Sequence, residues 1–252
     1  MAKSITSSSN SIIKETSALS LKKFREKTGM FILEGKKVIE EAIKADIDIQ
    51  QIFSIEENNY PSKEQYIITK EIMSKIATTE TPPSILGVAK MPIYNFEDIK
   101  AGHILLLENI KDPGNLGTII RTAVASGIAG IILAGECVDL YNPKVIRSTT
   151  GNIFKIPIIK CKNIEEIKKK FPSYLFTGTI LDEAKRPTPL HKIDFSHHRI
   201  IMFGSEADGL SIEAQKNADE YLKIPLKNDV ESLNLAISVG IVLYEISRAT
   251  EF

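Results

Sequence analysis

Short apolar runs alternate with amphipathic segments along most of the chain. Residues 103–110 form a continuous apolar run, which is typical of a parallel strand buried on both faces. Residues 113–127 instead repeat apolar side chains at helical spacing and end in a glycine. Because strand and helix patterns alternate in this way as far as residue 248, we predict an α/β fold with a mostly parallel sheet and helices on both faces.

The first ninety-odd residues alternate helix and strand as a small α/β unit. After a Ser-rich opening of about ten residues, which we expect to be mobile, the pattern predicts a helix over residues 11–27. A strand is predicted at residues 29–35, and residues 92–100 are predicted to form a linker. We therefore divide the chain into two domains, 1–95 and 96–252.

The last apolar segment, residues 227–248, is predicted to be a buried helix. Asn228 and Glu231 have the spacing of a capping box at its start. This helix-start chemistry does not account for Ser232 and Asn234, which lie among residues suited to a core. Because buried polar groups need partners, these two side chains indicate a bound ligand or a polar network.

Charge is balanced over the whole chain, with a formal net charge of zero, so no overall field favours nucleic acid. The first thirty residues nevertheless carry an excess of cations, which forms either a solvated surface or a binding patch. If it is a patch, Lys22, Lys23 and Arg25 are our candidates for binding nucleic acid.

Two cysteines without CxxC spacing, Cys137 and Cys161, argue against a disulfide scaffold and against a structural zinc site. We expect both to be reduced in a cytoplasmic protein. The sequence also lacks an apolar stretch long enough to span a membrane and an apolar leader, so we expect no membrane association. The pair His197 and His198 is interpreted as surface, and no metal site is predicted.

Polar or glycine-rich residues follow three of the predicted strands, in residues 108–123, 203–210 and 224–236. In open parallel sheets, ligands bind beyond the carboxyl ends of the strands. Each cluster alone is equally compatible with helix caps and turns. No dinucleotide-binding glycine motif, phosphate-binding loop or nucleophile elbow occurs among them.

Taken together and in this order, the three clusters resemble the sequence motifs of the SpoU (TrmH-type) RNA ribose 2′-O-methyltransferases of the SPOUT superfamily. The matching segments are "NIKDPGNLGTIIRTA", "FGSEADGL" and "IPLKNDVESLNLAISVGIVLYE", within residues 105–248. Ala207 departs mildly, because glycine is common there. The first part, through "FILEG" and its basic flank, is similar to the ribosomal-protein-like substrate-binding domain of rRNA-directed members.

The resemblance implies a C-terminal deep trefoil knot, a homodimer, and S-adenosylmethionine as the methyl donor without a metal. By motif match, Gly204, Ile224 and Leu233 would bind this cofactor, and Thr177 and Gly178 are further candidates.

The resemblance also implies a set of catalytic residues. By motif match these are Asn115, Arg121, Glu206, Ser232 and Asn234. Arg121 is the family's proposed activator of the ribose hydroxyl. Because guanidinium stays protonated, we assign Arg121 to holding a phosphate and stabilising alkoxide charge. Asn115 and Glu206 would orient Arg121 and the RNA.

The function implied is methylation of a ribose 2′-hydroxyl, of a guanosine in 23S rRNA. The RNA partner would be 23S rRNA or a ribosome-assembly intermediate. Two alternatives remain open. One is a tRNA 2′-O-methyltransferase, which the N-terminal domain disfavours. The other is a non-catalytic RNA-binding assembly factor with the same fold, which the presence of Arg121 and Asn234 disfavours.

Overall fold

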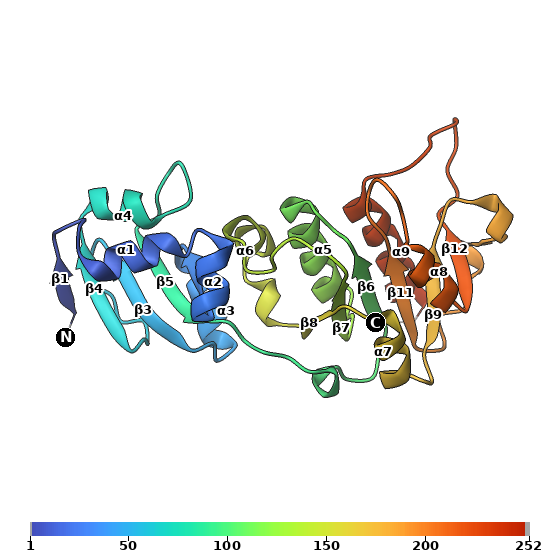
Figure 1. The fold of residues 1–252 in the computed structure, drawn as a ribbon, viewed down its shortest axis with the longest axis horizontal. Coiled ribbons are helices and arrows are strands. Elements are labelled where there is room, and N and C mark those ends of the chain that lie inside the picture. Colours follow the sequence, from blue (N-terminus) through green and yellow to red (C-terminus); the bar gives the residue numbers. More distant parts are fainter. Residues whose placement is uncertain (1, 250–252) are drawn as a thin grey trace. The chain divides into compact units, whose positions relative to one another are not determined.

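A computed structural model describes residues 2–249 of the chain (Figure 1). The chain folds into two compact units. The N-terminal unit consists of the residues up to Pro92 together with Asp139–Lys155, and the C-terminal unit consists of Ile93–Val138 and the residues from Ile156 onward. The segment Asp139–Lys155 therefore interrupts the sequence of the C-terminal unit but folds as part of the N-terminal unit.

The N-terminal unit contains a mixed five-stranded sheet of order β1-β4-β3-β5-β2. Its strands are β1 (Lys3–Ile5), β2 (Met30–Glu34), β3 (Ile49–Ser54), β4 (Glu64–Ile68) and β5 (Ile85–Lys90). The mobile opening that we expected is wrong for Lys3–Ile5, because these residues pair in parallel with β4. Strand β4 escaped the sequence analysis, because its residues Glu64, Gln65 and Tyr66 carry polar groups.

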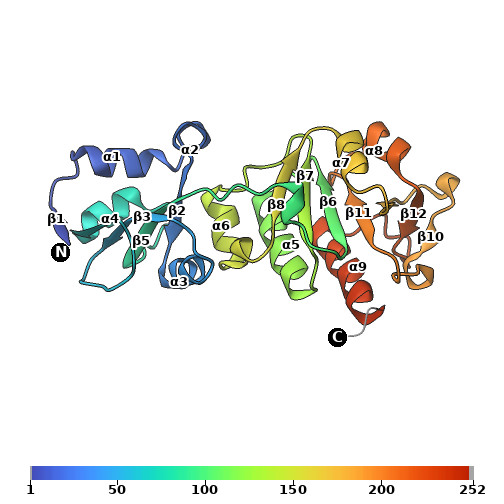
Figure 2. The same ribbon diagram turned by 90° about the horizontal axis from the view of Figure 1, so that it is seen from below.

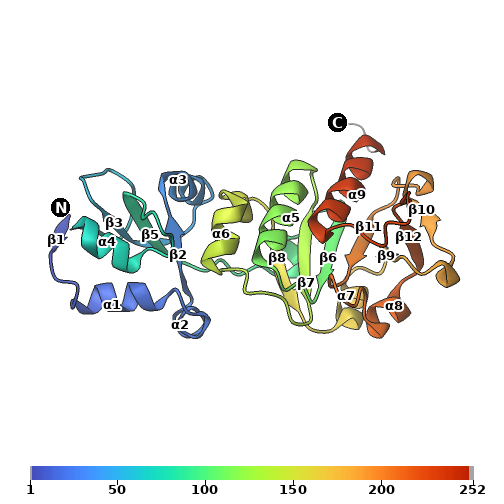
Figure 3. The ribbon, with the colours of Figure 1, turned by 90° about the horizontal axis from the view of Figure 1, so that it is seen from above.

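The helices of this unit are α1 (Ser11–Ala18), α2 (Lys22–Thr28), α3 (Lys36–Lys44) and α4 (Lys70–Ile76). Helices α1 and α4 pack together, and α3 covers the opposite face of the sheet (Figures 2 and 3). The single helix expected over residues 11–27 is broken between α1 and α2. The break lets Leu19 enter the core and frees the carbonyls of Leu19 and Ser20 for a side-chain donor.

The C-terminal unit contains a seven-stranded sheet of order β10-β12-β9-β11-β6-β7-β8 in which the paired strands are parallel. Its strands are β6 (Ile104–Glu108), β7 (Gly130–Ala134), β8 (Ile158–Cys161), β9 (Leu175–Thr179), β10 (Thr188–Pro189), β11 (Arg199–Phe203) and β12 (Glu220–Lys223). The central strands β6, β7 and β11 are buried along their whole length, as continuous apolar runs predict.

Helices cover both faces of this sheet. Helices α5 (Pro113–Ala125) and α9 (Leu235–Ala249) pack together on one face, and α7 (Ile164–Lys170) and α8 (Ile212–Asn217) pack together on the other (Figures 2 and 3). The predicted mostly parallel α/β fold is thus confirmed. The remaining helix, α6 (Pro143–Thr149), belongs to the N-terminal unit.

Helix α9 begins later than the sequence pattern suggested. The helix was expected from residue 227, but it starts at Leu235. The predicted capping box is wrong, because Asn228 and Asp229 both adopt positive φ and form the tip of an irregular loop. The cap is Asn234, whose Oδ1 accepts hydrogen bonds from the backbone N–H groups of Ala236 (2.9 Å) and Ile237 (3.3 Å).

A buried histidine lies just before β6. Nδ1 of His103 accepts a hydrogen bond from the backbone N–H of Arg199 at 3.3 Å. Burial, and the positive charges that His198 and Arg199 can contribute, lower the pKa of His103 to about 4 from an ordinary value of 6.5. His103 is therefore neutral in the folded protein at neutral pH.

We predict that the C-terminal unit loses stability as the pH falls from about 6.5 towards 4. In this window the unfolded chain binds a proton at His103 and the folded chain does not, which favours unfolding by on the order of 2 kcal/mol once solvent screening is allowed for. His103→Asn retains the acceptor for Arg199 and should flatten this pH dependence. Urea unfolding of both proteins at pH 7 and pH 4.5 is the measurement; equal losses of stability would contradict the assignment.

Within residues 2–249, no helix is both long enough and apolar enough to cross a membrane.

Candidate active site

The three polar clusters follow three strands of the parallel sheet of the C-terminal unit. Residues 109–112 follow β6, residues 204–211 follow β11, and residues 224–234 follow β12. Strands β6 and β11 are direct neighbours in the sheet, and β12 lies beyond β9. Because parallel strands end at the same edge of a sheet, the fold brings the clusters together, as predicted.

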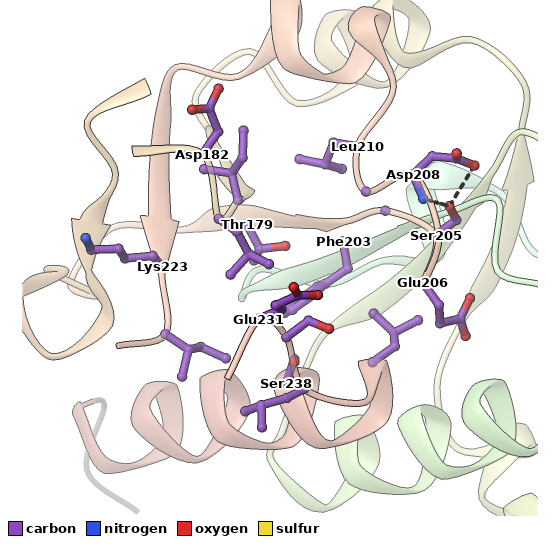
Figure 4. Close-up of a pocket in the computed structure, with 18 of the residues that line it drawn as sticks. Thr179, Asp182, Phe203, Ser205, Glu206, Asp208, Leu210, Lys223, Glu231 and Ser238 are labelled. Atoms are coloured by element: carbon purple, nitrogen blue, oxygen red, sulfur yellow. Dashed lines mark hydrogen bonds between the residues drawn. The ribbon is translucent and has the colours of Figure 1, made fainter. Parts of the chain in front are cut away.

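A cavity of about 630 Å³ lies among the second and third clusters (Figure 4). This volume is in the usual range for small-molecule sites, roughly 300–1,000 Å³. Its wall combines apolar side chains with a few polar groups, among them Thr179, Glu231 and Ser238. Five of the predicted catalytic and cofactor-binding residues line it, namely Gly204, Glu206, Ile224, Ser232 and Leu233.

The structure does not bring Thr177 and Gly178 to this cavity. Thr177 is fully buried in β9, where its hydroxyl donates to Glu220 at 2.9 Å. A Cβ at Gly178 would lie 3.0 Å from the ring of Tyr221, so this glycine serves strand packing. The residues that do line the cavity begin at Thr179, the last residue of β9, and continue through Asp182 in the segment that follows the strand. The motif match therefore reached the right strand but placed the cofactor contacts one to two residues before its end at Thr179.

A chain of hydrogen bonds joins one residue from each cluster. Nδ2 of Asn234 donates to Oδ1 of Asn115 at 3.1 Å, and Nδ2 of Asn115 donates to Oε1 of Glu206 at 2.7 Å. Because Oδ1 of Asn234 also caps α9, the side-chain amides of Asn234 and Asn115 both have a defined orientation. The helix start thus polarises two amides in series towards the Glu206 carboxylate.

Tight backbone packing shapes the loop that carries Glu206. The backbone of Ser205 pairs with that of Gly209 in both directions, at 3.0 and 3.1 Å. Ser205 Oγ also accepts from the N–H of Asp208 at 3.0 Å. A Cβ at Gly204 would lie 1.9 Å from the carbonyl carbon and oxygen of Gly209, so only glycine fits there. The loop of residues 204–210 is compact and forms part of one wall of the cavity (Figure 4).

Sequence reasoning missed the role of Glu108. This carboxylate is buried at the end of β6, and its Oε2 accepts from the backbone N–H of Ser211 at 2.8 Å. This hydrogen bond joins Ser211, at the end of the second polar cluster, to the end of β6, which leads into the first cluster. A charged residue at the end of an otherwise apolar buried strand was the available signal.

Four members of the predicted catalytic set are exposed, namely Arg121, Glu206, Ser232 and Asn234, and two of them, Arg121 and Ser232, lack a side-chain partner within residues 2–249. Among residues 2–249, the side chain of Arg121 makes no hydrogen bond or ion pair, although it lies on the same helix as Asn115. A free guanidinium is available for an anionic ligand. Ser232 is exposed on the cavity wall, and its hydroxyl likewise has no protein partner in the described part of the chain.

Arg25 corrects one of our RNA-binding candidates. Its side chain is only 2% exposed, and its guanidinium is bonded to Asp139 and to the carbonyls of Leu19 and Ser20. It cannot contact RNA in this conformation. Lys22 and Lys23 are exposed on α2, where Lys22 lies 3.6 Å from Glu26 and Lys23 lies over the ring of Phe24.

No group of three or more His, Cys, Asp or Glu side chains suited to a metal ion occurs in the described range 2–249. Both cysteines are free thiols. The C-terminal unit has a small-molecule cavity at the carboxyl edge of a parallel sheet, beside a polar cluster formed by one residue of α5 and two residues of loops.

Comparison with known families identifies which protein class this geometry belongs to. The SpoU rRNA Methylase family matches residues 102–244, and the MRM3-like substrate binding domain matches residues 10–87. The chain therefore belongs to the SpoU rRNA methylase family and is an RNA methyltransferase.

Curated and solved relatives agree with this membership. The chain is 31% identical to 23S rRNA (guanosine(2553)-2′-O)-methyltransferase RlmP of Bacillus subtilis, over 97% of this chain and 99% of that protein. The AdoMet-bound rRNA methyltransferase from Sinorhizobium meliloti superposes with a TM-score of 0.89 at 30% identity, covering 98% of both chains. A solved structure concerned with 2-OH methylation of C/U34 on tRNA matches at 27% identity with a TM-score of 0.52, covering 95% of that chain and 58% of this one.

Proposed function

We propose that this protein transfers a methyl group from S-adenosylmethionine to a ribose 2′-hydroxyl of 23S rRNA, at a guanosine. The hydrogen-bonded chain Asn234–Asn115–Glu206 carries this proposal, because it unites the three family motifs beside one cavity. The B. subtilis relative, similar over nearly its full length, acts on a 23S rRNA guanosine, which favours the same class of substrate here.

The cavity fits the cofactor. Its wall offers apolar surface from Phe203, Leu210 and Leu222 for a nucleoside, with polar groups nearby. Gly204, Ile224 and Leu233 line it and are the residues proposed to hold the cofactor, through the closely packed backbone around Gly204. When bound, S-adenosylmethionine supplies a methyl group already activated by its sulfonium.

The residues of the protein must align the ribose and stabilise charge on its oxygen. Arg121, exposed and without a protein partner in residues 2–249, would hold the phosphate next to the target ribose and stabilise the developing alkoxide. Asn115 and Glu206 would orient the RNA around it. Ser232, on the cavity wall, would donate its hydroxyl to the substrate. Positioning of this kind supplies several kcal/mol of the barrier reduction, on the order of 7 in favourable cases.

The N-terminal unit favours rRNA over tRNA as the substrate. The tRNA-related structure covers only 58% of this chain, whereas the S. meliloti rRNA methyltransferase covers 98%. The extra part of this chain contains the match to a substrate binding domain, residues 10–87. We propose that this domain binds 23S rRNA or a ribosome-assembly intermediate in the cytoplasm.

We also propose a homodimer and a C-terminal trefoil knot, as the family resemblance implies. An apolar stripe on α9 supports the dimer. Ile237 is 56% exposed and Tyr244 is 65% exposed, and the half-buried Ile241 lies between them at helical spacing. Exposed apolar stripes of this kind mark protein interfaces.

We predict that Lys22→Ala with Lys23→Ala weakens RNA binding severalfold and lowers its salt dependence. Each lysine that contacts a phosphate releases counterions from the RNA. Cofactor affinity should stay unchanged, because α2 belongs to the other unit. Filter binding at several salt concentrations measures both effects, with the exposed Lys63 and Lys90 as control substitutions far along the chain. RNA affinity equal to that of the wild type would show that the α2 lysines are only a solvated surface.

The experiment that tests the function is transfer of labelled methyl groups to 23S rRNA and tRNA transcripts, followed by mapping of the methylated ribose. Methylation of a 23S ribose supports the proposal. Methylation of tRNA alone would support the tRNA alternative. RNA binding without methyl transfer to either substrate would support a non-catalytic assembly factor.

A further inference from the structure

The segment Asp139–Lys155 is an integral part of the N-terminal unit, although it lies within the range matched by the SpoU family. Its Tyr141 and Phe154 rings pack against Phe31 of β2, with ring centroids 4.8 and 6.1 Å apart. Val145 and Ile146 of α6 are buried as well. The segment thus supplies core side chains to the substrate-binding unit.

A buried ion pair fixes the first residue of the segment. Nε and NH2 of Arg25 donate to Oδ2 of Asp139 at 2.8 and 2.6 Å. NH1 of Arg25 donates to the carbonyls of Leu19 and Ser20, both at 2.8 Å. Both charged side chains are buried, so the pair is shielded from solvent and salt. The basic residue that the sequence suggested for RNA binding is instead an anchor.

Two more ion pairs hold the rest of the segment. Arg147 lies 3.3 Å from Oε2 of buried Glu34, and it donates to Thr78 at 2.6 Å. Lys155, at the end of the segment, lies 2.8 Å from Glu41. Glu34, which the "FILEG" motif contains, therefore serves the attachment of α6.

The same segment begins directly after a loop that supports the catalytic cluster. The N–H of Val138 donates to the carbonyl of Ile110 at 2.7 Å, and the N–H of Glu136 donates to Oδ1 of Asn109 at 2.8 Å. Asn109 itself has a positive φ of 58°, a conformation that these contacts hold in place. Two residues beyond Ile110, Asp112 caps α5 by accepting from the N–H of Asn115 at 2.7 Å.

We propose that Arg25 and Asp139 are positioning residues for methyl transfer. Their ion pair fixes Asp139, the covalent neighbour of Val138, and so holds the loop on which the backbone of Asn109 and Ile110 rests. That backbone leads within a few residues to Asn115 and the hydrogen-bonded chain to Glu206. This inference rests on the proposed function.

The test uses the full-length double variant Arg25→Met with Asp139→Asn. Removing both charges together takes away the whole ion pair, whereas either single change would break the pair and keep one of its two buried charges. Asparagine also retains the oxygen that accepts from the N–H of Tyr141. We expect single-turnover methylation of an rRNA fragment to slow about tenfold, with cofactor affinity within about twofold of wild type. Hydrogen exchange of the Val138 amide should accelerate about tenfold.

The control is Lys155→Met, which breaks the partly exposed pair with Glu41 at the other end of the segment, sixteen residues from Asp139. It should change none of these quantities by more than about twofold. A double variant with wild-type turnover and wild-type Val138 exchange would overturn the inference. So would a parallel fall in turnover, cofactor affinity and melting temperature, which indicates general loosening. If the wild-type protein methylates no RNA, the proposed function fails separately, and the Val138 exchange alone then decides whether the ion pair holds the loop.

Discussion

Arg121→Ala is expected to lower the rate of methyl transfer by about a hundredfold or more while leaving fold and cofactor binding intact. Arg121 is exposed and lies outside the cavity wall, and its side chain makes no hydrogen bond or ion pair within residues 2–249. Its removal therefore breaks no side-chain hydrogen bond or ion pair. What is lost is the planar donor that we assign to the RNA phosphate and to the developing alkoxide.

Arg121→Lys should fail almost as severely, because an ammonium cannot reproduce the two-pronged geometry of guanidinium. Transfer of labelled methyl groups to an rRNA fragment measures the rate, with a thermal melt and a cofactor titration on the same samples. Thr118→Ala, an exposed substitution one turn earlier on α5, is the matched control and should be near wild type. Near-wild-type turnover in Arg121→Ala would remove Arg121 from the catalytic set.

Gly204→Ala is expected to abolish measurable cofactor binding. The added methyl group would lie 1.9 Å from the carbonyl carbon and oxygen of Gly209, and both are backbone atoms that no side-chain rotation can move away. The paired backbone of Ser205 and Gly209 would have to open, and one wall of the cavity would be lost. Calorimetric titration of the full-length protein with S-adenosylmethionine is the measurement.

A matched control for Gly204→Ala lies in the same loop. Gly209 has a positive φ of 67°, but an added Cβ would meet no atom within 4 Å. Gly209→Ala should therefore cost only the conformational penalty of about 1 kcal/mol and weaken cofactor binding modestly. Equal behaviour of the two variants would mean that the close packing at Gly204 does not shape the binding site.

Much of the sheet of the C-terminal unit could be predicted from sequence, because its buried strands are continuous apolar runs between turn residues. The start of α9 could not. Residues 227–234 contain a plausible capping box, and only the tertiary structure shows that Asn228 and Asp229 adopt positive φ while Asn234 caps the helix. Local pattern favoured the earlier start at residue 227, whereas the observed start at Leu235 leaves Asn234 free to bond to Asn115.

Sequence also predicted only part of the candidate site. Motif resemblance located Asn115, Glu206 and Asn234, and the structure joins them by hydrogen bonds. Arg25 was misjudged, because a cation in a basic stretch has the same sequence signature whether it faces solvent or a buried carboxylate. Its partner, Asp139, lies 114 residues away in the chain. Periodicity and composition carry no information about a contact at that separation.

The insertion of Asp139–Lys155 into the N-terminal unit also constrains how the protein can fold during synthesis. When Pro92 leaves the ribosome, the N-terminal sheet has all its strands but lacks Tyr141, Phe154 and the partner of Arg25. At about 5–20 residues per second, the roughly sixty further residues take several seconds to translate. Throughout that interval the nascent unit keeps an uncovered apolar face around Phe31 and an unpaired arginine. The N-terminal half thus completes its fold only after part of the catalytic half has been made, so the two halves mature together instead of one after the other.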